Sequence, residues 1–320
     1  MWKILIKINK NLIFAIPMAL MMGFITGIYT DVTSLKTLIL PLTFLMVYPM
    51  MVSLKFKKVF TGGDTKVQLL TQSINFLIIP FFTYAVGMFF FADSPYLLLG
   101  LLLAGLLPTS GMTISWTGFA KGNVESAVKM TIFGLALGSL ATPLYIKMLL
   151  GTTIPIDYVV VIKQIIYIIF IPMALGYATQ QYILNKYGQK HFQEKIAPKF
   201  PAVSTIGVLS IVFIAMALKA KAVADSPQLL LNIMVPVAFI YLVNFLLSTI
   251  IGRFTLDRGQ GIALVYGTVM RNLSIALALA INTFGAAGSD AALVICAAYI
   301  IQVQSAAWYV KLTDKIFGSI

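Results

Sequence analysis

The fold is decided by an apolar stretch with a charge at its centre, ALVYGTVMRNLSIALALA at residues 263–280. It lies in a candidate membrane span over about 260–283, in which eleven residues precede Arg271 and twelve follow it. An arginine at the centre of a bilayer costs about 3 to 17 kcal/mol, so it needs a partner, water or an anionic substrate. A purely structural arginine bonded to helix ends is the alternative, and we favour a role in a binding site.

A second apolar stretch is interrupted in its middle, GLLPTSGMTISWTGF at residues 105–119. Pro108 removes a backbone hydrogen bond and clashes with the preceding turn. Broken backbone at membrane depth is tolerated only where it is buried in protein or lines a cavity. Thr109, Ser110 and Thr113 offer polar partners to such a break. A simple kink, in which hydroxyls bond back to the carbonyls of their own helix, is the alternative.

The chain as a whole has the composition of an integral membrane protein. Of its 320 residues, 60% are hydrophobic and 10% are charged, whereas soluble domains average roughly 45–50% and 25%. This excludes a soluble enzyme, a disordered chain and a secreted disulfide scaffold. We expect an all-α membrane protein whose ten transmembrane helices cover about 11–30, 35–54, 67–91, 96–119, 124–150, 157–182, 201–220, 228–252, 260–283 and 290–311.

The basic residues predict the orientation of these spans. With the N-terminus inside, sixteen Lys and Arg fall in inside loops, among them Lys55, Lys57 and Lys58, and four fall outside. Both termini are therefore expected in the cytoplasm of a multi-pass cell-membrane protein. The first apolar run resembles a signal peptide, but without a small-residue cleavage pattern we interpret it as a retained span. The net charge of +13 thus indicates the lipid bilayer as partner and no nucleic acid.

Residue usage leaves little room for catalysis or metal binding. Cys296 is the only cysteine and His191 the only histidine, so no disulfide, metal site, cofactor or histidine-based catalytic centre is expected. Without acids near the predicted midplane, a membrane-embedded enzyme has no visible acid–base machinery. Lys129 follows Glu125 by four residues and is expected to pair with it or to extend to the membrane surface.

Two short echoes indicate an internal repeat. IPMAL occurs at 16–20 and at 171–175. NFL occurs at 75–77 and at 244–246, so that Asn75 and Asn244 are the first residues of its two copies. We expect a first five-span repeat over about 11–150, within a region 1–182 that also holds the start of the second, and a second repeat over 157–311. Because five is odd, the repeats must be inverted, as in many secondary transporters.

The residues around both breaks resemble those of a known transporter superfamily. PTSGMTISWTGFAKGN at 108–123, MRNLSIALALA at 270–280 and NFLIIP at 75–80 are similar to signatures of the bile acid:sodium symporters and the related arsenite exporters. The resemblance implies a panel of spans 1, 2, 6 and 7 and a core of spans 3–5 and 8–10. Broken spans 4 and 9 would cross at the midplane and face a substrate cavity, and motion of core against panel would give alternating access.

Several ligand positions depart from the family pattern. The sodium-site glutamate of the symporters corresponds to Gly267 and the glutamine to Arg271, so the resemblance leaves Thr113, Thr131 and Gly267 as the remnant of an ion site. A fixed arginine there would repel sodium, and its guanidinium is expected to take over the structural role of the cation. The cysteine of the arsenite exporters corresponds to Thr109.

The leading hypothesis is a secondary transporter of a small organic or inorganic anion that lacks the usual sodium sites. Helix N-termini at the breaks would also attract an anion. Arsenite or metalloid efflux and an anion channel are the alternatives, and the sequence leaves the oligomeric state open. The candidate substrate-binding residues are Arg271, Asn272, Ser274, Thr109, Ser110, Thr113, Asn75 and Asn244.

Overall fold

The computed structural model describes residues 2–54, 64–151, 154, 157–285 and 287–318. Lys55, Lys57 and Lys58, which were assigned to an inside loop, lie outside these residues. The chain forms two compact units, each assembled from separate stretches of sequence. The first unit comprises Met1–Leu54, Asp157–Leu230 and Ser274–Cys296, and the second comprises Lys55–Ile156, Leu231–Leu273 and Ala297–Ile320.

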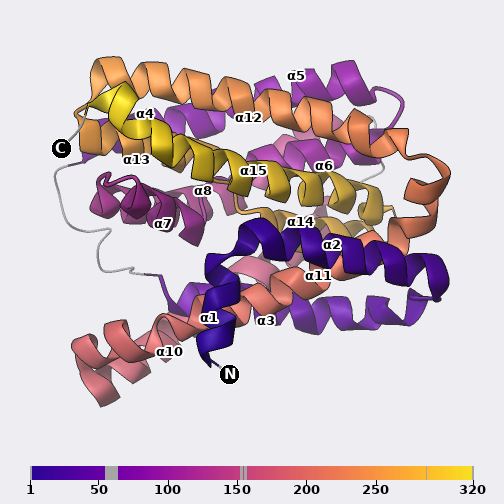
Figure 1. The fold of residues 1–320 in the computed structure, drawn as a ribbon, viewed down its shortest axis with the longest axis horizontal. Helices are drawn as coiled ribbons and strands as arrows, with labels where there is room; N and C mark the ends of the chain where they lie inside the picture. The colour runs from indigo at the N-terminus through magenta and orange to yellow at the C-terminus, as the bar shows by residue number, and fades with distance from the viewer. Residues whose placement is uncertain (1, 55–63, 152–153, 155–156, 286, 319–320) are drawn as a thin grey trace. The chain divides into compact units, whose positions relative to one another are not determined.

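The first unit is built from helices of both predicted repeats (Figure 1). They are α1 (Trp2–Lys10), α2 (Leu12–Tyr29), η1 (Thr33–Leu38), α3 (Ile39–Val52), α9 (Tyr158–Ile165), η4 (Ile166–Phe170), α10 (Ile171–His191), η5 (Phe192–Ile196), α11 (Lys199–Asp225), α14 (Leu273–Phe284) and the first turns of α15 (Gly288–Phe317). Helix α11 packs against α2 and α3, and α3 packs against α10. Nε2 of Gln180 in α10 donates to the carbonyls of Val52 and Leu54, and these bonds attach the end of α3 to α10.

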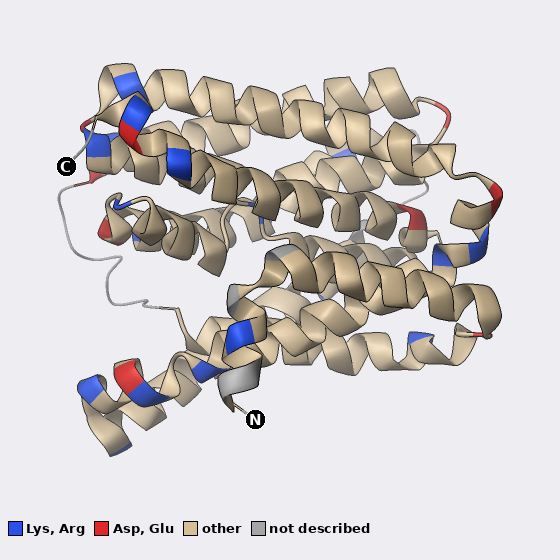
Figure 2. Cartoon of the chain, in the orientation of Figure 1, with Lys and Arg blue, Asp and Glu red and all other residues tan. Residues whose placement is uncertain are grey.

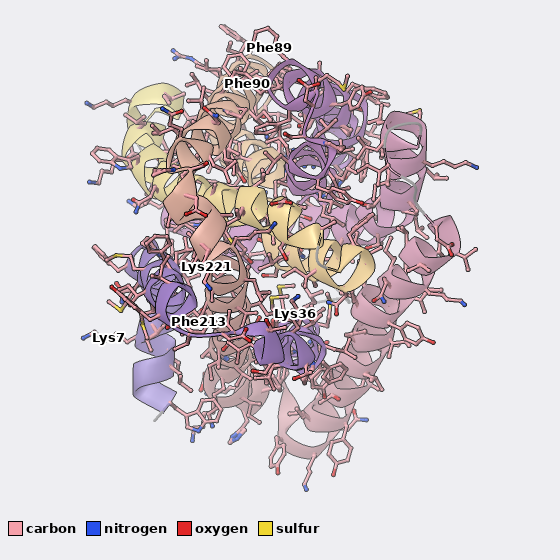
Figure 3. The ribbon with its side chains drawn as sticks, turned by 90° about the vertical axis from the view of Figure 1, so that its right-hand side faces the viewer. Lys7, Lys36, Phe89, Phe90, Phe213 and Lys221 are labelled. Atoms are coloured by element: carbon pink, nitrogen blue, oxygen red, sulfur yellow. The ribbon has the colours of Figure 1, made fainter. Side chains whose placement is uncertain are left out.

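The turn between α2 and η1 is held by Asp31. Its Oδ1 accepts hydrogen bonds from the hydroxyl of Thr33 at 2.6 Å and from the amide of Thr33 at 2.9 Å. These bonds hold the pKa of Asp31 below its usual value, and the charges of Lys221 and Lys36, both labelled in Figure 3, act in the same direction. Asp31 therefore remains ionised and fixes the turn.

The second unit holds the breaks of both interrupted stretches, at Pro108 and at Arg271. Its helices are α4 (Thr65–Ser73), η3 (Ile74–Ile78), α5 (Ile79–Phe91), α6 (Pro95–Leu106), α7 (Gly111–Phe119), α8 (Val124–Leu150), most of α12 (Gln228–Thr255), α13 (Arg258–Val269) and the rest of α15. Helix α13 packs against α4, α7 and α8. A buried cluster that includes Val67, Ile79, Met130 and Leu264 forms part of its core.

Two long helices contain a π-helical turn just before a proline. The turn η3 precedes Pro80, and the turn η4 precedes Pro172. A proline has no N–H, and its ring clashes with the carbonyl four residues earlier. A local π turn relieves that clash without ending the helix. The long apolar helices therefore continue through their prolines.

The helices have the length and surface of membrane spans. Among the residues that the structure describes, seven helices are long and apolar enough to cross a bilayer, and Phe14–Tyr29, Pro95–Leu106 and Leu273–Phe284 are shorter apolar helices. In each unit, charged residues gather mainly near the helix ends (Figure 2). Large apolar side chains lie exposed on the outer faces, as Phe89 and Phe90 do on α5 (Figure 3). This confirms an all-α, multi-pass membrane protein, while the count of ten spans and the inverted repeat stay predictions.

Candidate functional site

The predicted interruption at Pro108 is a true break between two helices. Helix α6 ends at Leu106 and α7 begins at Gly111. Thr109 has a φ of 63°, a left-handed conformation that is uncommon for residues other than glycine. Ser110 then caps α7: its side chain accepts from the amide of Met112, and the hydroxyl of Thr113 accepts from the amide of Ser110. This capping box gives hydrogen-bond partners to two backbone amides at the start of the new helix.

The break at Arg271 pairs directly with the break at Pro108. The amide of Thr109 donates to the carbonyl of Met270 at 2.8 Å, and the amide of Asn272 donates to the carbonyl of Leu107 at 2.8 Å. Together they form a short antiparallel bridge in which Pro108 lies opposite Arg271. In such a pair the hydrogen bonds come from the flanking residues. The missing N–H of proline therefore costs nothing at this position.

A glutamine of α15 holds the backbone of Arg271. Oε1 of Gln302 accepts from the amide of Arg271 at 2.7 Å, and Nε2 of Gln302 donates to its carbonyl at 3.2 Å. The hydroxyl of Tyr241, from α12, also donates to Oε1 of Gln302. Sequence reasoning missed both residues. The signal for Gln302 was an amide side chain within the apolar span 290–311, which also contains Gln304, and nothing marked Tyr241.

The two asparagines from the sequence echoes both bind the end of α13. Asn75 donates from Nδ2 to the carbonyl of Gly267 at 3.0 Å, and Asn244 donates to the carbonyl of Thr268 at 2.9 Å. These carbonyls lie in the last turn of the helix, where backbone acceptors have no partner within the helix. Both amides therefore support the break from opposite halves of the chain, and both side chains are buried.

The side chain of Arg271 is buried without a hydrogen-bond partner at its two terminal nitrogens. The residue is 3% exposed, and within the described part of the chain neither Nη1 nor Nη2 has a partner. Arg271 lines a cavity of about 20 Å³ together with Tyr241, Asn244 and the α6 residues Ala104 and Gly105. The structure thus places an unpaired guanidinium beside the crossing of the two breaks.

The hydroxyls of the expected ion-site remnant bond to nearby backbone. Thr131 donates to the carbonyl of Ala127 at 2.8 Å, and the hydroxyl of Thr113 accepts from the amide of Ser110 at 3.2 Å. The hydroxyl of Thr109, a candidate substrate contact, likewise lies 2.7 Å from the carbonyl of Pro108 and 3.2 Å from that of Thr131. The third remnant position, Gly267, has no side chain, and a Cβ there would lie 2.5 Å from the sulfur of Met130. Methionine therefore fills the space that a carboxylate would need.

The remaining candidates divide between the units. Asn272 joins the bridge through its backbone amide and is buried in the second unit. Ser274 is buried in the first unit, near the start of α14. Lys129 is also buried, and its Nζ lies 2.7 Å from Oδ2 of Asp64, a partner that sequence spacing did not predict.

The chain is similar to known membrane transporters. Residues 40–226 match the model of the "Sodium Bile acid symporter family". The chain is 28% identical over 209 residues to the arsenical-resistance protein Acr3 of Alkaliphilus metalliredigens, an alignment that covers 61% of this chain and 58% of the relative. It is 20% identical over 258 residues to the Acr3 of Corynebacterium glutamicum, covering 77% and 70%. Sodium/bile acid cotransporter 7-A of Xenopus laevis is 24% identical over 168 residues, covering 48% and 47%.

Proposed function

The chain belongs to the sodium bile acid symporter family, and on that premise we propose that it is a secondary transporter of a small anion. The single observation that carries the choice of an anion is the unpaired guanidinium of Arg271. An arginine stays protonated in proteins, and a buried charge without a partner is strongly unfavourable. An anion that reaches the cavity removes that penalty by pairing with Nη1 and Nη2.

The hydroxyl groups of the first break support the same proposal. Ser110 and Thr113 each accept a backbone hydrogen bond, and a hydroxyl that accepts can still donate its own proton. Helix α7 also begins beside them at Gly111, and the N-terminus of a helix favours negative charge. Ser110 and Thr113, together with Thr109, Asn272 and Ser274, are proposed as the further contacts of the substrate along its path.

Transport is proposed to be independent of sodium. Sodium binds best where several oxygens converge, usually with a carboxylate among them. Here the space beside Gly267 is filled by Met130, and the hydroxyl of Thr131 donates to its own helix. The positive charge of Arg271 would further oppose a second cation in this unit.

We place this activity in the architecture that the family resemblance implies. Ten spans in two inverted repeats, 11–150 and 157–311, would form a panel of spans 1, 2, 6 and 7 and a core of spans 3–5 and 8–10. Both termini would lie in the cytoplasm, and the protein would lie in the plasma membrane. Each unit gathers stretches from both predicted repeats, which supports this arrangement, and residues 274–296 of the predicted core spans 9 and 10 fall with the panel spans in the first unit. Motion of core against panel would expose the substrate to each side in turn.

The experiment is uptake of labelled anions into proteoliposomes that contain the purified protein. Chloride, sulfate and small carboxylates are tested with and without sodium. Arg271→Gln should abolish uptake, and Arg253→Gln should leave it unchanged because Arg253 is an exposed residue of α12. Uptake that survives Arg271→Gln would overturn the anion assignment. A strict requirement for sodium would overturn the sodium-independent mechanism alone.

Arsenite efflux is the second candidate, because two of the similar proteins carry the name arsenical-resistance protein. Arsenite is neutral near pH 7 and would not need Arg271. The chain has Thr109 where the resemblance to that branch implies a cysteine. Expression in an arsenite-sensitive host tests this candidate: resistance that persists in Arg271→Gln would favour efflux of arsenite over transport of an anion.

A further inference from the structure

We propose that the cavity at Arg271 is a binding site for one halide-sized anion. The inference rests on the proposed function in that it names the class of anion that this site takes. The cavity lies wholly within the second unit, and its walls come from α5, α6, α12 and α15 together with the break itself. It is therefore a site of one compact body.

The size of the cavity limits its occupant. A volume of about 20 Å³ holds about one water-sized particle, since a single water needs roughly 10–15 Å³ on the same measure. Sulfate and carboxylates carry several heavy atoms and do not fit without rearrangement of the walls. A monatomic anion such as chloride or bromide fits.

The donors in the cavity point to an anion. The hydroxyl of Tyr241 donates to Gln302, and Nδ2 of Asn244 donates to the carbonyl of Thr268. Among the described residues that line the cavity, Nη1 and Nη2 of Arg271 are the buried side-chain atoms without a partner. A guanidinium presents its N–H groups as a planar fork and accepts nothing. The ligand must therefore be an acceptor.

The walls favour a halide over a water molecule. A water that accepts from Arg271 must also place its own two protons on acceptors. Most of the lining is apolar, with Leu101, Val237 and Ile240 among the side chains. A halide needs no acceptor and also neutralises the buried charge.

The test is the thermal stability of the full-length protein, purified in detergent with gluconate as the only anion. Sodium chloride and sodium bromide are titrated against sodium gluconate, sulfate and acetate at matched ionic strength. A ligand that binds only the folded state raises stability with its concentration relative to Kd. We expect a saturable rise in Tm with chloride and bromide and none with sulfate or acetate. An equal rise with sulfate would overturn the size argument.

Two variants link the effect to this cavity. Arg271→Gln should remove the halide-dependent rise in Tm, whereas the exposed control Arg253→Gln should keep it. Ala298→Val keeps the charge but fills the cavity that Ala298 lines, and it should weaken halide binding at least tenfold. Its neighbour Ala297, which is buried but does not line the cavity, provides the matched control Ala297→Val. If Arg271→Gln does not fold, the alanine pair decides the question.

The outcomes separate this inference from the proposed function. One outcome is a stable protein whose Tm does not change with halide concentration but whose uptake of a larger anion depends on Arg271. That outcome would overturn the halide site and leave anion transport in place. Saturable halide binding that Ala298→Val weakens, without uptake of any anion into proteoliposomes, would support the site and overturn the transport proposal. Halide binding that is equal in all four variants would place the anion elsewhere and overturn the inference.

Discussion

Lys129 carries a second buried positive charge in the second unit. In contrast to the charge of Arg271, it is compensated by an ion pair with Asp64. The atoms Nζ and Oδ2 lie 2.7 Å apart, and the side chains are 4% and 11% exposed. Removing one partner of a buried pair leaves an uncompensated charge, which costs about 3–5 kcal/mol. We expect Lys129→Met to lower the free energy of unfolding by about 3 kcal/mol, measured as a lower Tm in detergent.

The control for this prediction is Lys163→Met, because Lys163 is an exposed residue of α9. It should change the Tm little. Adding Asp64→Asn to Lys129→Met should recover part of the loss, since removing both charges is often close to neutral. If Lys129→Met and Lys163→Met change the Tm equally, the buried pair does not stabilise the fold.

The sequence could predict those site residues whose side chain is unusual for its position in the chain. Arg271 was recognisable because a charge in the middle of a span is expensive, and Asn75 and Asn244 because each begins one copy of a repeated tripeptide. Gln302 and Tyr241 have neither property. Their role depends on the distance of α15 and α12 from the break, which no local pattern encodes.

At the scale of helices, the pairing of the two breaks depends on close approach of α8. Gly134 and Gly138 lie one turn apart on this helix, the spacing of a small-residue packing motif. A Cβ on Gly138 would lie 2.7 Å from Cδ of Pro108, and a Cβ on Gly134 would lie 2.5 Å from Oγ1 of Thr109. Because the proline ring is fixed to the backbone, Gly138→Ala must displace the break itself.

We expect Gly138→Ala to lower the stability by about 1–3 kcal/mol, the usual cost of overpacking, and to reduce transport as well. The measurement is the Tm in detergent together with uptake into proteoliposomes. Gly111→Ala is the control, because Gly111 begins α7 and a Cβ there meets nothing within 4 Å. A Gly138→Ala protein with unchanged Tm and uptake would show that the breaks tolerate displacement of α8.

Helix boundaries were predictable where a residue opposes the helix, whereas the crossing of spans 4 and 9 was implied only by the family resemblance and by no local pattern. Pro108 and Arg271 marked both breaks, and Ser110 and Thr113 were recognisable as polar partners of the first. The antiparallel bridge between Pro108 and Arg271 joins residues far apart in sequence, and neither residue specifies the other. The π turns before Pro80 and Pro172 likewise follow from proline chemistry, although proline alone does not say whether a helix bends or ends.

For the whole molecule, the arrangement of spans makes a prediction about which side each loop faces. Lys36 lies in η1, at the start of the second predicted span, and Lys190 lies near the end of α10, after the sixth. Five predicted spans separate them, so they should face opposite sides of the membrane. The excess of basic residues around Lys190 predicts that this side faces the cytoplasm. Both side chains are exposed.

Single cysteines test this arrangement in intact cells. Cys296 is the only cysteine of the chain, so Cys296→Ala gives a background without thiols. In that background, Lys36→Cys should react with a membrane-impermeant maleimide added to intact cells. Lys190→Cys should react only after the membrane is permeabilised. The reverse pattern would invert the topology, because the two loops would have exchanged sides. Equal labelling of both in intact cells would require an even number of spans between them, and a ten-span fold of two inverted halves would then be excluded.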